Sequence, residues 1–182
     1  MSAGRTGAVH RDAPAGVPRV GPELGSPLLH RVRGVFHRAV SPAHAHAAIA
    51  GSRVAGRYSR AGQPTLYLSA TPEGVAAAML AHAQARAASP VVVKIEVDAP
   101  RVFDLRDAAA REAAGIDLTD ALGEWRSVAA AGGTPASWRV RARVEALGAT
   151  GLIDPSRKAP GLWHLVLFAW NTGGGARVRP LP

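Results

Sequence analysis

One apolar run constrains the fold of this chain more than any other feature. Val91, Val92 and Val93 stand together, and from Lys94 to Asp98 polar and apolar residues alternate. A central strand that leaves the protein core shows this change from a continuous to an alternating pattern. The segment 91–98 is therefore predicted to be a central strand of a sheet.

Further strands and helices are expected on both sides of this strand. Extended segments are predicted over residues 34–40, 65–69, 101–105, 151–153, 162–168 and 176–180. Helices are expected where Ser, Thr, Pro or Gly residues mark the ends of a segment. These helical segments are 42–50, 72–88, 108–114, about 119–128 and 135–148. Strands interspersed with helices predict a single α+β domain, whose strand order stays open.

The composition of the 182 residues is that of one folded domain with a flexible leader. The chain is 47% hydrophobic and 19% charged, which is enough apolar material for a core. Residues 1–32 are rich in Gly, Pro and Ala and show no sustained periodicity. We therefore expect residues 1–32 to be a flexible leader and residues 33–182 to form the domain.

The charge and the missing residue types narrow the possible partners. A net charge of +9 favours nucleic acid, a phosphate-bearing small molecule or an acidic protein, and does not choose among them. No basic tail is present, so direct nucleic-acid binding is not favoured. The chain has no cysteine, which excludes disulfides and thiolate metal sites. Without an apolar run of about 18 residues or a secretory signal, we expect a soluble cytoplasmic protein.

The stretch 56–69 is the strongest candidate for a binding site. It is a Gly- and Pro-containing loop that carries Arg57, Tyr58 and Arg60 and leads into the predicted strand 65–69. The next helix begins directly after it, at Pro72. Guanidinium groups and the N–H groups of a helix N-terminus can hold an anion. On the residues alone, the alternative of a solvated surface loop stays open.

The histidines at positions 37, 44, 46 and 82 do not indicate a metal site. His44 and His46 are two residues apart, which places them on different faces of the predicted helix. No carboxylate cluster joins them, so no metal is expected.

Four segments form an ordered pattern that extends from residue 35 to about residue 171. The first is Phe36-His37-Arg38-Ala39, and the second runs from Gly56-Arg57-Tyr58-Ser59 through Gly62 to Leu66-Tyr67-Leu68. The third lies within 103–126, and the fourth begins with Gly151-Leu152-Ile153-Asp154-Pro155-Ser156 and ends at Phe168. In this order the four segments resemble the RES domain family, whose members are toxins paired with Xre-type antitoxins, and the second is similar to the family signature.

The resemblance implies a fold like that of ADP-ribosyltransferases, with a split central sheet flanked by helices and an NAD+ cleft at the split. Known activities of the family are cleavage of NAD+ by water or phosphate and transfer of ADP-ribose to a protein. The implied partner is an Xre-family antitoxin that covers the active site in a hetero-oligomer. Any DNA would be contacted only through that antitoxin.

The resemblance also implies roles for single residues. Arg38 and Arg57 would bind the pyrophosphate, because guanidinium groups contact phosphate oxygens bidentately. Tyr58 or Tyr67 would stack on the nicotinamide ring. Ser156 would hydrogen-bond NAD+ or hold a neighbouring arginine. Ser156 and Tyr67 are thus the catalytic candidates present in this chain.

One family residue is missing. The family takes its name from an Arg, a Glu and a Ser; Arg38 and Ser156 match the first and last, but Ala78 stands at the position of the Glu. A carboxylate there would stabilise the positive charge that develops on the ribose. Three interpretations follow: an NAD+-cleaving toxin impaired by Ala78, an ADP-ribosyltransferase that modifies a host protein, or an inactive domain that binds NAD+ or a partner.

Overall fold

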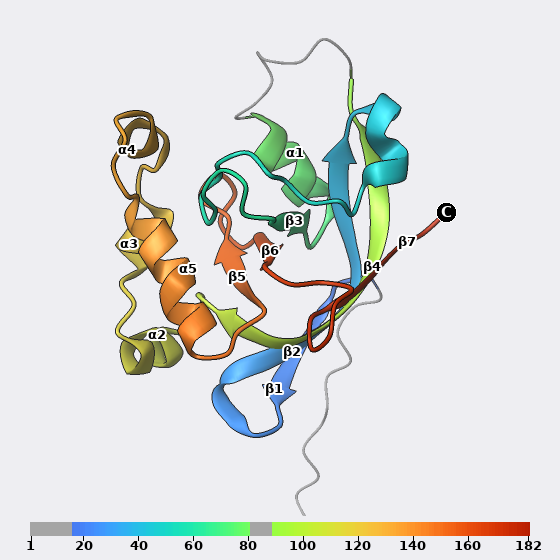
Figure 1. Ribbon diagram of the computed structural model, residues 1–182. Helices are drawn as coiled ribbons and strands as arrows, with labels where there is room; N and C mark the ends of the chain where they lie inside the picture. The colour runs from blue at the N-terminus through green and yellow to red at the C-terminus, as the bar shows by residue number, and fades with distance from the viewer. Residues whose placement is uncertain (1–15, 81–88) are drawn as a thin grey trace, which may run out of the picture.

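The computed structural model describes residues 16–80 and 89–182. One seven-stranded sheet runs through it, in the order β1-β2-β3-β6-β5-β4-β7 (Figure 1). The strands are β1 (Arg19–Glu23), β2 (Ser26–Val40), β3 (Leu66–Ser69), β4 (Val91–Asp104), β5 (Gly151–Pro155), β6 (Trp163–Leu167) and β7 (Arg177–Pro180). The helices are the 3-10 helix η1 (Pro42–Ala47), α1 (Pro72–Leu80), α2 (Ala108–Ala114), α3 (Leu118–Leu122), α4 (Arg126–Ala130) and α5 (Ala136–Ala146). The predicted α+β class is confirmed.

The two long strands β2 and β4 make the sheet curl upon itself. They pair antiparallel from Leu29 opposite Phe103 to Val40 opposite Val91. β2 also pairs with β3, while β4 continues in parallel to β5, and β6 lies between β3 and β5. These pairings form a closed circuit of five strands. The pairing is shortest between β2 and β3, where His37 opposite Ser69 is the one paired position, but the sheet is continuous there among the described residues.

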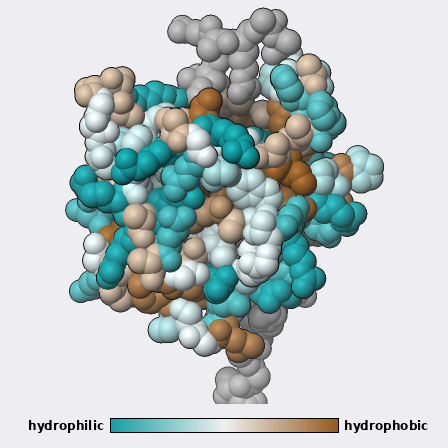
Figure 2. All heavy atoms as spheres, viewed as in Figure 1, coloured by the Kyte–Doolittle hydropathy of each residue, from teal (hydrophilic) through white to brown (hydrophobic). Residues whose placement is uncertain are grey.

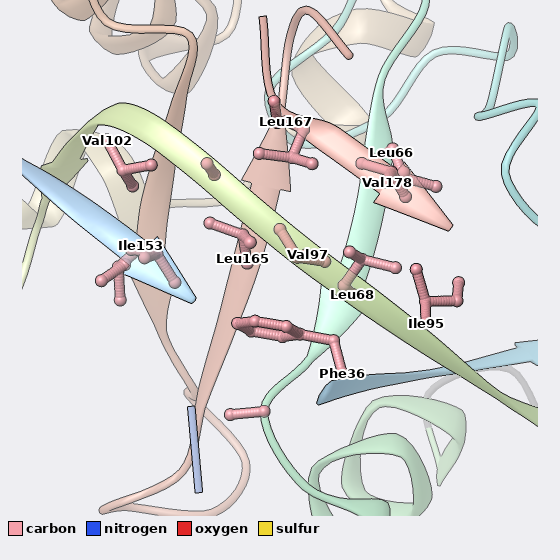
Figure 3. Close-up of a cluster of buried hydrophobic side chains, with 14 of the residues drawn as sticks. Phe36, Leu66, Leu68, Ile95, Val97, Val102, Ile153, Leu165, Leu167 and Val178 are labelled. Atoms are coloured by element: carbon pink, nitrogen blue, oxygen red, sulfur yellow. The ribbon is translucent and has the colours of Figure 1, made fainter. Parts of the chain in front are cut away.

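Two apolar clusters lie on the two faces of the curled sheet. Inside the circuit, Phe36, Leu68, Val97 and Leu165 point toward one another from four strands (Figure 3). The second cluster lies between the outer face and the helices α2, α3 and α5, which Figure 1 shows grouped on one side of the sheet. The face drawn in Figure 2 carries hydrophilic side chains between small apolar patches. The buried apolar side chains of the described residues therefore form two clusters, one on each face of the curled sheet.

The folded part of the described chain begins earlier than predicted. The strand expected over 34–40 is only the second half of β2, and β1 with the first half of β2 occupies residues 19–32. The Gly and Pro residues that suggested a leader here serve the hairpin: Gly25 turns it with φ = +85°. Gly34 lets the chain pass over Pro18, because a Cβ at Gly34 would lie 2.7 Å from the Cα of Pro18. Residues 1–15 of the expected leader lie outside the described residues.

Other element boundaries also differ from the predictions. The strands expected over 91–98 and 101–105 are one strand, β4, since the irregular register near His30 accommodates Pro100, which has no N–H, and Arg101 with φ = +54°. The helix expected from about 119 to 128 is interrupted at Gly123 and forms α3 and α4. The helix expected over 72–88 is described as far as Leu80, and the rest of it, with His82, falls outside the described residues.

Candidate functional site

A pocket of about 670 Å³ opens beside the narrow junction of β2 and β3. Its walls come from the end of β2, the loop 52–57, β3, helix α1, residues 125–126 and the segment that follows β5. Five of the six site residues predicted from the sequence line it: Arg38, Arg57, Tyr67, Ala78 and Ser156. The structure therefore brings together residues that are up to 118 positions apart in the chain (156 − 38).

Tyr58 does not line this pocket. Its side chain is fully buried in the cluster beneath the helices, and its hydroxyl donates to Oδ1 of Asp154 at 2.8 Å. The hydroxyl also lies 3.2 Å from the carbonyl oxygen of Ala121. Stacking of Tyr58 on a nicotinamide ring does not fit this arrangement, whereas Tyr67 is half-buried and does line the pocket.

Helix α5 explains why Tyr58 points inward. Its residues Ser137, Trp138 and Arg141 donate to three successive backbone carbonyls of the loop, those of residues 57, 56 and 58, at 2.5, 2.9 and 3.0 Å. These three bonds hold the backbone of the loop against the helix. The side chain at 58 enters the core, and Arg57 reaches the pocket wall.

Of the two predicted phosphate-binding arginines, Arg57 is buried and Arg38 is partly buried, and their side-chain hydrogen bonds go to backbone oxygens. The Arg57 guanidinium donates to the carbonyls of Ala121 and Gly123 at 3.2 and 2.8 Å, and Arg38 donates to the carbonyl of Ala48. Among the described residues, neither forms an ion pair. Burial lowers the pKa of both arginines from an ordinary value of 12.5, and an arginine stays protonated at neutral pH. Each therefore presents an unneutralised positive charge to the pocket.

Tyr67 and Ser156 are held by local hydrogen bonds. The Tyr67 hydroxyl accepts from the backbone N–H of Tyr58 at 3.2 Å and packs against Gly56, where a Cβ would lie only 2.6 Å from it. Burial raises the pKa of Tyr67, so its hydroxyl keeps its proton at neutral pH. Ser156 Oγ accepts from the backbone N–H of Ala159 at 3.2 Å, which makes Ser156 a turn residue as well as a pocket residue.

A row of polar residues crosses four strands along one wall of the pocket. Its members are opposite one another in the strand register: His37 faces Ser69, Ser69 faces His164, and His164 faces Asp154. All four line the pocket, and Ser69 Oγ lies 3.0 Å from Nδ1 of His164. Burial lowers the pKa of both histidines, which favours neutral imidazoles. Sequence reasoning missed Ser69, His164 and Asp154, because only the strand pairing brings them together.

The lining of the pocket is strongly cationic. It contains five arginine or lysine side chains and, within the described part of the chain, one carboxylate. The cations are Arg38, Arg57, Arg126, Arg157 and Lys158, and the carboxylate is Asp154. A partly enclosed site with this balance attracts an anionic ligand with more than one negative charge.

Comparison with known proteins agrees with the motifs found in the sequence. Residues 28–181 match the RES domain family. The chain belongs to this family. Among solved structures, the RES domain is similar to the crystal structure of the M. tuberculosis MbcT–MbcA toxin–antitoxin complex, with a TM-score of 0.53 and 19% identity. The match covers 82% of this chain and 84% of the other. The search of curated proteins finds no match.

Position 78 of this RES domain lies where a side chain would reach the pocket. Ala78 is on helix α1, is exposed, and lines the pocket together with Val75 and Met79 of the same helix. Glu73, the nearest acid on the helix, does not belong to the lining. Hydrogen bonds at the helix start lower its pKa, as expected for a residue that caps a helix.

Two further features of the RES domain can be stated for the described residues. In residues 16–80 and 89–182, no three His, Cys, Asp or Glu side chains are grouped as a metal would need. Within the same ranges, none of the helices has the length and apolar character to cross a membrane.

Burial of Asp154 predicts a stability that depends on pH. Burial raises the pKa of Asp154 from 3.8 to about 6, while the hydrogen bond from Tyr58 acts in the opposite direction. The folded protein thus binds this proton more tightly than the unfolded chain. The charged carboxylate therefore lowers the free energy of unfolding, fully above pH 6 and not at all below pH 3.8. Asp154→Asn should therefore raise the free energy of unfolding at pH 8 by on the order of 2 kcal/mol.

Denaturant unfolding of both proteins at pH 8 and pH 4 measures this effect. The gain from Asp154→Asn should shrink between pH 6 and pH 4. A gain of the same size at both pH values would show that the charge of Asp154 is not its cause.

Proposed function

We propose that this RES domain is the toxin of a toxin–antitoxin pair and that its pocket binds NAD+ as a substrate. One observation carries the proposal: the motif residues of the family, Arg38, Arg57, Tyr67 and Ser156, converge on one cationic pocket. The structural neighbour MbcT, described as a toxin in a toxin–antitoxin complex, supports it.

The pocket offers a partner for each part of the dinucleotide. Arg57 is buried and Arg38 is partly buried, neither forms an ion pair among the described residues, and both suit the pyrophosphate. Tyr67 provides an aromatic ring for the nicotinamide. Ser156 follows β5 directly, lines the same pocket and can donate its hydroxyl proton to the ligand.

The reaction is cleavage of the bond between nicotinamide and ribose. The bonding electrons leave with nicotinamide, the ribose becomes an oxocarbenium-like centre, and water or phosphate adds to its C1′. A carboxylate beside the ribose would stabilise that centre, and Ala78 offers only a methyl group. We therefore propose that this chain binds NAD+ but cleaves it slowly. Mass spectrometry of the products, with and without phosphate, distinguishes hydrolysis from phosphorolysis.

Two other functions would use the same pocket. An ADP-ribosyltransferase would place a host protein where water or phosphate otherwise attacks. A catalytically inactive RES domain would only bind NAD+ or a partner, and Ala78 favours this second alternative. Incubation with labelled NAD+ and cell extract tests the first, because only a transferase leaves the label on protein.

The proposed partner is an Xre-family antitoxin that covers the pocket in a cytoplasmic hetero-oligomer. The net charge of +9 and the cationic pocket suit an acidic segment of such a partner. DNA would be bound only through the antitoxin. Co-expression with a helix-turn-helix protein encoded alongside, followed by measurement of the mass of the complex, tests this proposal. The antitoxin should also compete with NAD+ for the pocket.

NAD+ is expected to stabilise the protein against heat, and Arg38 and Arg57 should both be required for this effect. At about 100 times its Kd, a ligand adds about 2.7 kcal/mol to the stability of the folded state. For a domain of this size that is a rise in Tm of about 5–11 °C. Arg38→Ala and Arg57→Ala should each remove most of the rise, measured by differential scanning fluorimetry.

Arg60→Ala is the matched control for this experiment. Arg60 lies on the same loop but is exposed, stacks over Trp138 and does not line the pocket. Its replacement should leave the NAD+-induced rise unchanged. If all three variants responded to NAD+ like the original chain, the pocket would not be the NAD+ site.

A further inference from the structure

Asp154 is an acidic side chain in a site that otherwise presents cations. It lies in β5, directly opposite His164 of β6, and it is the one carboxylate in the described lining of the pocket. It forms no ion pair among the described residues. Its nearest bonded partner is Tyr58, whose hydroxyl donates to Oδ1 at 2.8 Å.

The second oxygen of this carboxylate has a different environment. Within the described part of the chain, Oδ2 of Asp154 accepts no hydrogen bond. Among the described residues, the side-chain atoms that are fully buried without a partner are Glu23 Oε2, His30 Nε2 and His37 Nδ1, and Oδ2 of Asp154 is not one of them. Oδ2 is therefore accessible, and because Asp154 lines the pocket, a ligand in the pocket can reach it. A carboxylate that is held through one oxygen and accessible through the other can accept a hydrogen bond from a ligand.

The chemistry of the lining selects what binds there. The five cationic side chains can only donate hydrogen bonds, and they suit the phosphates of a nucleotide. The hydroxyl groups of a ribose are donors of such a ligand that lie next to its phosphates, and an ionised carboxylate is a strong acceptor for them. Carboxylates hold ribose hydroxyls in this way in other dinucleotide sites.

We propose that Asp154 is a ligand-binding residue that accepts a hydrogen bond from a ribose 2′-hydroxyl through Oδ2. The inference rests on the proposed function, because it names the part of the nucleotide that this wall of the pocket recognises. The pocket would then recognise two parts of its ligand: the arginines would bind the phosphates, and Asp154 would bind the ribose hydroxyl. Dinucleotides carry two riboses, so two pairs of probes are needed to find which one is held.

The energetic cost of Asp154 supports a role in binding. A partly buried carboxylate without an ion pair destabilises the folded protein, as the raised pKa of Asp154 reflects. Tyr58 could donate to an asparagine oxygen equally well, so its hydrogen bond does not require the charge. A group that lowers stability and faces a pocket is typical of functional sites.

The test compares ligands that differ by one hydroxyl. Isothermal titration of the full chain and of Asp154→Asn with ADP and 2′-deoxy-ADP examines the adenine ribose. The same titration with nicotinamide mononucleotide and its 2′-deoxy analogue examines the nicotinamide ribose. In one of the two pairs, Asp154→Asn should weaken binding of the ribose form about tenfold, the size of one hydrogen bond to a charged group, and leave the deoxy form nearly unchanged.

Tyr58→Phe is the control for an indirect effect. It removes the hydrogen bond to Oδ1 and leaves the carboxylate, so the preference for the ribose ligand should survive. If Asp154→Asn weakened ribose and deoxy ligands equally in both pairs, Asp154 would only position the wall and the inference would be overturned. If the original chain bound neither NAD+ nor any of these ligands, the proposed function itself would fail.

Discussion

Ala78→Glu is expected to raise the rate of NAD+ consumption by about 10²–10³-fold. A preorganised group that meets the charge of a transition state commonly supplies a factor of this size. Position 78 lies on helix α1, is exposed and lines the pocket, so a longer side chain there has room to reach a ligand. The measurement is the rate of nicotinamide release from NAD+ by the purified chain and by the variant. Equal rates would contradict the role assigned to position 78.

Two control variants separate this effect from a general change in charge. Ala76→Glu places the same carboxylate on α1 at an exposed position that does not line the pocket, and it should give no gain. Ala78→Gln has nearly the shape of glutamate without its charge, so most of the gain should be lost. Thermal stabilisation by NAD+ should be retained in all of these variants, because the arginines are unchanged.

Arg141→Met is expected to lower the free energy of unfolding by about 3 kcal/mol. Arg141 is 5% exposed, donates to the carbonyl of Tyr58 at 3.0 Å and to Thr65 Oγ1 at 2.8 Å, and stacks over Phe168. Methionine fills similar space but leaves these buried acceptors unpaired. For a domain of this size the loss corresponds to a Tm lower by about 6–12 °C, measured by thermal unfolding.

Arg139→Met is the matched control on the same helix. Arg139 is exposed, and its side-chain hydrogen bond to the carbonyl of Thr134 is 3.4 Å long. A substitution at such a position changes stability by less than about 0.5 kcal/mol. Similar losses for both variants would mean that the buried contacts of Arg141 do not hold the loop 56–58 in place. A loosened loop should also weaken NAD+ binding, since Arg57 belongs to it.

The sequence contained enough information to locate the pocket, because its motifs are local. Arg57 and Tyr67 fall in one signature segment, and Arg38 lies at the end of a predicted strand, so short-range patterns identify them. Tyr58 could not be placed in this way. Its neighbour Arg57 reaches the pocket, but whether Tyr58 faces the pocket or the core is decided by helix α5, which lies about 80 residues later in the chain.

Asp154 and His164 show the complementary difficulty. Each is a polar residue in a short apolar strand, and nothing nearby in the sequence distinguishes it from an exposed position. Their common location follows from strand register alone, which sets His164 opposite both Ser69 and Asp154. The early start of β2 was missed for a related reason. Its Gly and Pro residues are typical of flexible segments, yet they form a hairpin that packs on β4.

The position of β6 between β3 and β5 has a consequence for the newly made chain. β3 is made well before β5, and the two strands do not pair with each other. Both pair with β6, which is available only after residues 163–167 have emerged from the ribosome. Asp154, Ser156 and His164 come after the lining residues up to Arg126, so a nascent polypeptide carries Arg38, Arg57 and Arg126 before the pocket is complete. An antitoxin that binds the completed wall would therefore meet its target only after β6 has been made.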